Sequence, residues 1–279
     1  MKKKFMILLI ILILAILIFN IFSKNKENVS DFKPLELDVG DSFTYLNYDI
    51  PMFVLNYMIR DVTGDGRNDM VMVIGEKANA IDEKVNNMDV VIYDTSGECF
   101  IKAGLKKCEG KSPKLMAANV DETASDEIIL LTQNDDSTQN IKVITMMNHE
   151  CKELMKPRDN KGLIVSGYFM DGFKVYLSIR KLKLETYLDL KEEKEKYINA
   201  GFYDADGRVL GENKNITVTP FVSTELITLN DRQGIKTVQR IIGFDYLDIL
   251  DEIEVVWKYE DGSWNIKEAK GKKLGNLLY

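Results

Sequence analysis

The chain has 279 residues, of which 45% are hydrophobic and 29% charged, with 18 glycines and five prolines. This composition is typical of a globular protein and excludes collagen-like, mucin-like and wholly disordered chains. The formal net charge is −7, and Lys2, Lys3, Lys4 and Lys24 lie close to the amino terminus, so the remainder is more acidic still. An acidic body repels phosphate groups, so we expect no nucleic-acid partner.

An apolar run of 18 residues, FMILLIILILAILIFNIF, occupies positions 5–22 and follows three lysines. As an α-helix rising ~1.5 Å per residue, it would span about 27 Å, close to the roughly 30 Å of a bilayer's hydrocarbon core. We predict a signal anchor, a single transmembrane helix, over residues 1–23. The lysines that precede it predict that the carboxy-terminal body lies outside the cell membrane. Cleavage of the leader as a signal peptide, giving a secreted protein, stays open as the alternative.

The polar segment 24–34 is predicted to be a short stalk, and residues 35–279 an extracytoplasmic β-rich domain. Short runs rich in Val, Ile and Tyr, separated by turn sequences, are typical of strands. The predicted strands are 52–59, 70–75, 89–94, 113–119, 127–132, 141–147, 172–179 and 252–259. One short helix is predicted over 190–200, ended by Gly201. The expected fold class is therefore all-β.

The sequence contains an internal repeat, in which the stretch RDVTGDGRNDMVMVIG at 60–75 realigns with ANVDETASDEIILLTQ at 118–133. Each copy is a polar loop followed directly by an apolar strand. A fainter third copy begins near residue 222. We expect repeats near 52–110, 113–155 and 218–267. This spacing suits a four-stranded unit such as a propeller blade, so we predict a propeller-like body.

The first of these loops, residues 61–69, predicts a metal site. Its side-chain oxygens stand at loop positions one, three, five and nine, with glycine at six, and alternate residues of a tight loop turn their oxygens toward one centre. Calcium, a hard cation with oxygen ligands, fits this pattern. The predicted ligands are Asp61, Thr63, Asp65, the backbone carbonyl of Arg67, and Asp69. The alternative is a metal-free turn in which Asp61 and Asp65 accept hydrogen bonds from backbone amides.

The second loop, residues 119–127, has the same spacing with fewer carboxylates and alanine in place of the glycine. Its candidate ligands are Asn119, Asp121, Thr123, the carbonyl of Ser125, and Glu127. Because only two carboxylates are in register here, we expect a metal-free turn more than a second calcium site.

The sequence from Asp61 to Asp69, followed by Met-Val-Met-Val, resembles the FG-GAP or VCBS-type repeat of integrin-like β-propellers and bacterial surface proteins. Segments 119–127 and 226–234 resemble it more weakly. The tail segments 238–243 and 255–266 are similar to the carboxy-terminal part of membrane-anchored bacterial proteins that carry such repeats. The resemblance implies calcium-stabilised, propeller-like blades displayed outside the cell.

The remaining candidate residues favour structural roles. His149 is the only histidine, which excludes sites built from two or more histidines. Trp257 and Trp264 bracket a predicted hairpin turn, where core or cross-strand packing is favoured over a ligand platform. Asp204 and Asp206 flank another turn, for which we expect a structural role. The three cysteines permit a disulfide between the first two or three free thiols.

We therefore expect a membrane-anchored, calcium-stabilised binding or structural module, and we favour a non-enzymatic role without excluding an enzyme. Its partner outside the cell would be a protein or a carbohydrate. Two alternatives stay open: an extracytoplasmic hydrolase acting on cell-wall or carbohydrate material, and an accessory or sensor subunit of a membrane complex.

Overall fold

The computed structural model describes residues 35–77, 84–123, 125–210, 215–230 and 232–278. By its contacts the chain divides into two compact units, Met1–Glu36 and Leu37–Tyr279. The second unit is the β-rich body and is described here by itself. The predicted anchor and most of the predicted stalk lie outside the described residues. Within the described part of the chain, no helix combines the length and the apolar character that crossing a bilayer requires.

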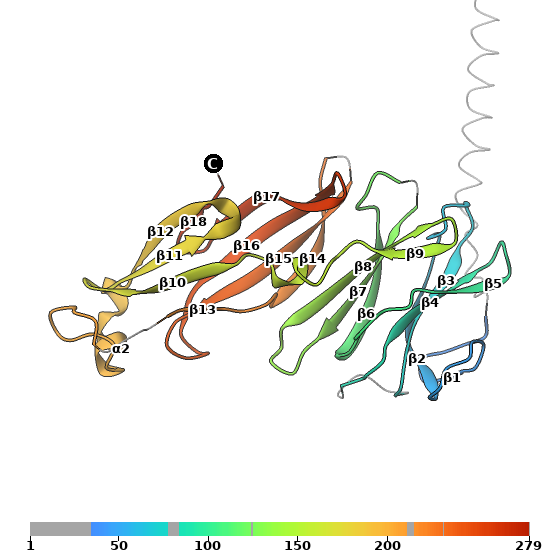
Figure 1. The fold of residues 1–279 in the computed structure, drawn as a ribbon, viewed down its shortest axis with the longest axis horizontal. Coiled ribbons are helices and arrows are strands. Elements are labelled where there is room, and N and C mark those ends of the chain that lie inside the picture. The colour runs from blue at the N-terminus through green and yellow to red at the C-terminus, as the bar shows by residue number, and fades with distance from the viewer. Residues whose placement is uncertain (1–34, 78–83, 124, 211–214, 231, 279) are drawn as a thin grey trace, which may run out of the picture. The chain divides into compact units, whose positions relative to one another are not determined.

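The described body is all-β, and its strands form four antiparallel sheets (Figure 1). Sheet 1 has the order β1 (Ser42–Phe43), β2 (Met52–Arg60), β3 (Asp69–Gly75), β4 (Asp89–Asp94) and β5 (Cys99–Lys102). Sheet 2 has the order β6 (Lys111–Ala118), β7 (Glu127–Gln133), β8 (Gln139–Met147) and β9 (Glu150–Glu153). Both are meanders in which each strand pairs with the next one along the chain.

The other two sheets come from the second half of the chain. Sheet 3 has the order β10 (Val165–Met170), β11 (Lys174–Ile179) and β12 (Leu184–Asp189). Sheet 4 has the order β13 (Thr217–Val218), β15 (Gln233–Ile242), β16 (Ile249–Glu260), β17 (Ser263–Gly271) and β18 (Gly275–Asn276), with β14 (Ser223–Thr228) also paired to β15. The short helical segments are η1 (Asp159–Lys161), η2 (Arg180–Leu182), η3 (Lys191–Glu193) and α2 (Lys194–Asn199).

Every predicted strand is confirmed, with ends displaced by three residues or fewer. The predicted helix is also confirmed, as η3 followed by α2. It ends where expected: Gly201 has a φ of +71° and donates its N–H to the carbonyl of Ile198 at 2.9 Å. The structure adds strands that the sequence analysis did not identify, namely β1, β5, β9, β10, β12, β13, β14, β15, β17 and β18.

Sheet 2 lies between two hydrophobic cores, which explains why its strands are continuous apolar runs. Successive residues of a strand point to opposite faces. On β7, Ile128 and Leu130 belong to the core shared with sheet 1, whereas Ile129 and Leu131 belong to the core shared with sheets 3 and 4. All four are buried. A strand covered on both faces has no solvent-facing positions, so the alternation of polar and apolar residues disappears.

Candidate functional site

The first loop folds around hydrogen bonds from its own backbone amides. Asp61 accepts the N–H of Gly64 on Oδ1 at 2.7 Å and the N–H of Gly66 on Oδ2 at 2.8 Å. Asp65 accepts the N–H of Arg67 at 2.8 Å. Gly66 has a φ of +86°, the left-handed conformation that the sequence predicts for it. The oxygens of Asp61 therefore stabilise the turn, as the metal-free alternative expects.

Asp69, at the last position of this loop, is fully buried and fixes the entry into β3. Its Oδ2 accepts the N–H of Val62 at 3.0 Å and the N–H of Thr63 at 3.1 Å. Its Oδ1 is buried, and no hydrogen-bond partner for this atom is present among the described residues. Burial raises the pKa of this carboxyl, and the two amide hydrogen bonds oppose the rise.

The second loop repeats this arrangement with a longer side chain. Glu127, also fully buried, accepts the N–H of Val120 at 2.8 Å and the N–H of Asp121 at 3.2 Å, both on Oε2. Its Oε1 accepts the hydroxyl of Thr145 at 3.2 Å. Burial raises the pKa of Glu127 as well. The alignment of the two sequence copies places the carboxylate and both amides opposite their counterparts in the first loop, so the sequence repeat corresponds to a repeated local structure.

The other predicted residues of the second loop form a compact turn. Asp121 accepts the N–H of Thr123 at 2.7 Å. Asn119 donates its amide to the carbonyls of Thr123 at 2.7 Å and Ser125 at 3.2 Å. The Ser125 carbonyl, a candidate ligand, therefore already accepts a hydrogen bond inside the loop.

The two loops contact each other. Arg60, at the end of β2, donates from Nε to Asp126 at 2.9 Å. A Cβ placed on Gly64 would lie 3.3 Å from the Cβ of Ser125, so the backbone of one loop packs against a side chain of the other. A larger residue at position 64 would also be strained by its φ of +80°.

The third predicted copy differs in local structure but lies next to the second loop. Between β14 and β15 the chain makes a short turn, closed by the N–H of Leu229 and the carbonyl of Arg232 at 2.8 Å, instead of a longer polar loop. The N–H of Gln233 donates to the carbonyl of Asn119 at 2.9 Å. The first loop, the second loop and this turn therefore follow one another in space, and we call them the loop row.

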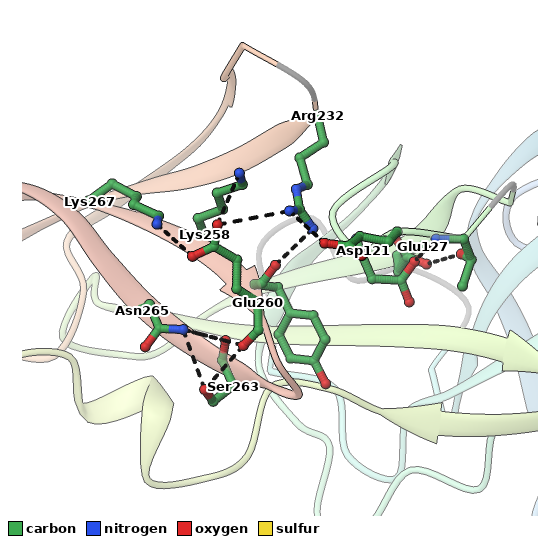
Figure 2. Close-up of polar contacts among 11 residues, drawn as sticks. Asp121, Glu127, Arg232, Lys258, Glu260, Ser263, Asn265 and Lys267 are labelled. Carbon is green, nitrogen blue, oxygen red and sulfur yellow. Dashed lines mark hydrogen bonds and ion pairs between the residues drawn. The ribbon is translucent and has the colours of Figure 1, made fainter.

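Arg232 connects the loop row to the hairpin between β16 and β17, as Figure 2 shows. Only 7% of its side chain is exposed. Its guanidinium donates to the carbonyl of Tyr259 at 3.1 Å and to the carboxylate of Glu122 at 3.0 Å. Glu260 lies 3.9 Å away and also pairs with Lys258 at 3.0 Å. The sequence analysis did not identify Arg232, because a single arginine in a turn is not part of any motif.

The loop row as arranged does not gather the predicted calcium ligands into a cage. No group of three or more His, Cys, Asp or Glu side chains that could hold a metal ion occurs in the described part of the chain. In the first loop, both oxygens of Asp61 and one of Asp69 face backbone N–H groups, which carry positive partial charge. A carboxylate oxygen that accepts an N–H still has a second lone pair, so these hydrogen bonds do not decide whether an ion binds, and calcium binding stays a prediction.

His149 lies on the surface, with 69% of its side chain exposed, and its Nδ1 is 3.5 Å from Oδ2 of the buried Asp94. Burial would raise the pKa of Asp94, but hydrogen bonds from Gly97 and Ser96 outweigh it and the pKa is lowered. The three cysteines are free thiols, which answers the disulfide question left open by the sequence.

The residues expected to have structural roles do so. Trp257 and Trp264 are each only 4% exposed and belong to the core of sheet 4. Asp204 accepts the N–H groups of Asp206 at 2.9 Å and Arg208 at 2.8 Å, which closes its turn.

The described fold is that of an all-β protein whose antiparallel sheets share two cores. A family model described as the YybI C-terminal domain matches residues 163–272. This segment is similar to that domain and contains sheet 3 and most of sheet 4, whereas sheets 1 and 2 and the first two loops lie outside it. Neither the curated proteins nor the solved structures gave a match.

Proposed function

We propose that this chain is a membrane-anchored, extracytoplasmic module that binds a partner and does not catalyse a reaction. Its first two sheets would be propeller-like blades, and the loop row would be their common edge. The observation that carries the proposal is the repeated loop, in which a buried carboxylate holds the backbone at the start of β3 and again at the start of β7.

The blade interpretation is supported by how equivalent residues are used in the two sheets. Val71 and Val73 of sheet 1 pack into the core shared with sheet 2. Their counterparts in the second copy of the repeat, Ile129 and Leu131, pack into the next core along the chain. Each sheet thus presents the same face to its successor, which is the relation between neighbouring blades of a propeller.

The membrane location rests on the sequence of residues 5–22, an apolar run preceded by three lysines. Calcium is proposed as a stabilising ion at the first loop, held by Asp61, Thr63, Asp65, the backbone carbonyl of Arg67, and Asp69. The calcium concentration outside cells makes binding on the order of 10⁻⁴ to 10⁻³ M sufficient for such a role.

Cysteine labelling tests the location. Cys99 is the exposed thiol, whereas Cys108 is buried and Cys151 is half-buried. Intact cells that express the full chain are treated with a membrane-impermeant maleimide. We expect labelling without permeabilisation, loss of the label in Cys99→Ser, and retention of the protein in the membrane after carbonate extraction.

Two results would contradict the proposal: labelling that appears only after permeabilisation, and release of the protein by carbonate. Recovery of the chain in the medium, with an amino terminus beyond residue 23, would instead support the secreted alternative. A Cys108→Ser variant is the matched control, because a buried thiol should contribute nothing to labelling of the native protein.

A further inference from the structure

A cleft with a volume of about 460 Å³ opens in the second half of the body, away from the first loop. Three segments enclose it: the chain between β9 and β10, the η2 turn, and the hairpin between β16 and β17. A cleft of this size is within the range of small-molecule sites, which is roughly 300–1,000 Å³. Its lining residues are Leu154, Lys156, Arg158, Asp159, Gly162, Ile164, Arg180, Lys181, Gly262, Ser263, Trp264 and Asn265.

The cleft is cationic although the protein is acidic. Four of its lining residues carry positive charge, Lys156, Arg158, Arg180 and Lys181, and one, Asp159, carries negative charge. The acid is already engaged: Oδ1 lies 3.7 Å from Nε of Arg158, and Oδ2 accepts the backbone N–H of Lys156 at 3.2 Å. The full chain carries a net charge of −7, so the lining of this cleft has the opposite sign of charge to the protein as a whole.

Lys181 shows that these cations are held close together. Its Nζ lies 4.4 Å above the centre of the Trp257 ring, which fixes the ammonium at the edge of the cleft. Burial lowers the pKa of Lys181, and the nearby Arg158 lowers it further while Asp159 opposes them. An anion in the cleft would favour the charged form of Lys181 and so oppose this fall in its pKa.

Buried hydrogen bonds hold the backbone of the cleft in place, whereas the four cationic side chains are exposed at its rim. The indole N–H of the buried Trp264 donates to the carbonyl of Leu154 at 3.3 Å. Gln239, which is 1% exposed, accepts the N–H of Leu163 at 2.6 Å and donates to the carbonyl of Thr219 at 2.9 Å. A Cβ on Gly162 would lie 2.2 Å from Gln239 Oε1, so the chain can pass this point only as glycine.

We propose that this cleft binds a phosphate-bearing ligand through its phosphate group. Four cations and one carboxylate leave a net charge of about +3, which favours a group with two or more negative charges over a single carboxylate. Arg158 and Arg180 offer planar guanidinium groups that can form paired hydrogen bonds to phosphate oxygens. The ligand is a free phosphorylated molecule or a lipid headgroup, and the two arms of the experiment below distinguish these sources. The inference rests on the binding role proposed above and does not depend on the membrane location.

Tryptophan fluorescence gives a direct readout, because the chain contains only two tryptophans. Trp264 lines the cleft and Trp257 lies beneath Lys181. The full chain in neutral detergent micelles is titrated with inorganic pyrophosphate at low salt, with acetate as the single-carboxylate comparison. A second arm places phosphatidylglycerol or phosphatidylcholine in the micelles.

We expect a saturable fluorescence change with pyrophosphate that weakens as salt is added. The double variant Lys156→Gln/Arg180→Gln should bind about tenfold or more weakly, since it removes two charge-assisted contacts and leaves both tryptophans and Lys181 in place. The control Lys152→Gln/Lys174→Gln removes the same charge from exposed strand positions and should bind within about twofold of wild type.

A response to phosphatidylglycerol alone, lost in the double variant, would support the proposal with a lipid headgroup as the source. No saturable change with pyrophosphate or phosphatidylglycerol would overturn it, as would equal binding of acetate or equal losses in the two double variants. None of these outcomes affects the Cys99 labelling result. Either the phosphate site or the proposed location can therefore be refuted without refuting the other.

Discussion

Replacing Asp69 tests whether a buried carboxylate holds the first loop. In Asp69→Ala the N–H groups of Val62 and Thr63 lose their acceptor, and the Val62 amide is buried. An unsatisfied donor costs ~1–3 kcal/mol, so we expect a loss of about 3 kcal/mol in the free energy of unfolding. For a body of this size, ~2–4 °C per kcal/mol gives a melting temperature lower by roughly 6–12 °C.

Asp69→Asn separates the acceptor from the charge. Its carbonyl can still accept from both amides, and it carries no charge to be desolvated, so we expect a loss under about 1 kcal/mol at neutral pH. Because burial raises the pKa of Asp69 in the folded state, the wild-type stability contribution falls as pH rises from the unfolded value of ~3.9 through the folded value. Asparagine does not titrate, so Asp69→Asn lacks this pH-dependent loss. The difference in free energy of unfolding between Asp69→Asn and wild type should therefore move in favour of the variant as the pH rises through this range.

Urea and thermal unfolding of the full chain, followed by far-UV circular dichroism, measure both variants. Asp65→Ala is the control, since Asp65 is exposed and accepts a single amide, that of Arg67. It should cost about 0.5 kcal/mol or less. If Asp69→Ala and Asp65→Ala have the same melting temperature, the hydrogen bonds from the amides to Asp69 do not stabilise the loop. If Asp69→Asn is as unstable as Asp69→Ala, the negative charge matters and not the acceptor.

Four further outcomes are expected. Glu127→Ala should lose about 3 kcal/mol in urea unfolding, because four hydrogen-bond donors face its carboxylate; a loss no larger than that of a Glu→Ala change at an exposed position would contradict the structural role of the repeat. Arg232→Ala should lower the free energy of unfolding by roughly 2 kcal/mol. Its partner Glu122 is 81% exposed, so Glu122→Gln should lower it by under about 0.5 kcal/mol. Equal losses in the two variants would mean that the surface ion pair accounts for the effect. At ~5 mM calcium and a Kd near ~1 mM, binding should stabilise the body by roughly 1 kcal/mol and Asp61→Asn should remove the gain; a melting curve unchanged by calcium and by chelator would refute the site. In the native state only Cys99 should react with a disulfide reagent, because burial raises the pKa of Cys108 to about 12 and that of Cys151 to about 11. The other two thiols should react after unfolding. Prompt reaction of all three in the native state would mean that the core is open to the reagent.

The sequence predicted well what depends on neighbours along the chain. Strands such as β3 and β7 are apolar runs of strand length, and the turn after α2 needs the conformational freedom of Gly201, so both could be located from local chemistry. The internal repeat also indicated that two segments would fold alike. Its most informative member was the carboxylate directly before each apolar strand, at Asp69 and Glu127, although spacing alone suggested a metal ligand at these positions.

Tertiary structure decided what each side chain faces. The carboxylates of Asp61 and Asp69 have backbone amides within hydrogen-bonding distance, and spacing along a loop does not say whether an oxygen will meet an ion or an N–H group. Arg232 and Glu122 lie 110 residues apart and meet through the packing of separate sheets. The cations of the cleft, from Lys156 to Lys181, come from segments without a shared motif. Charge and burial act through space, so only the folded chain brings these groups together.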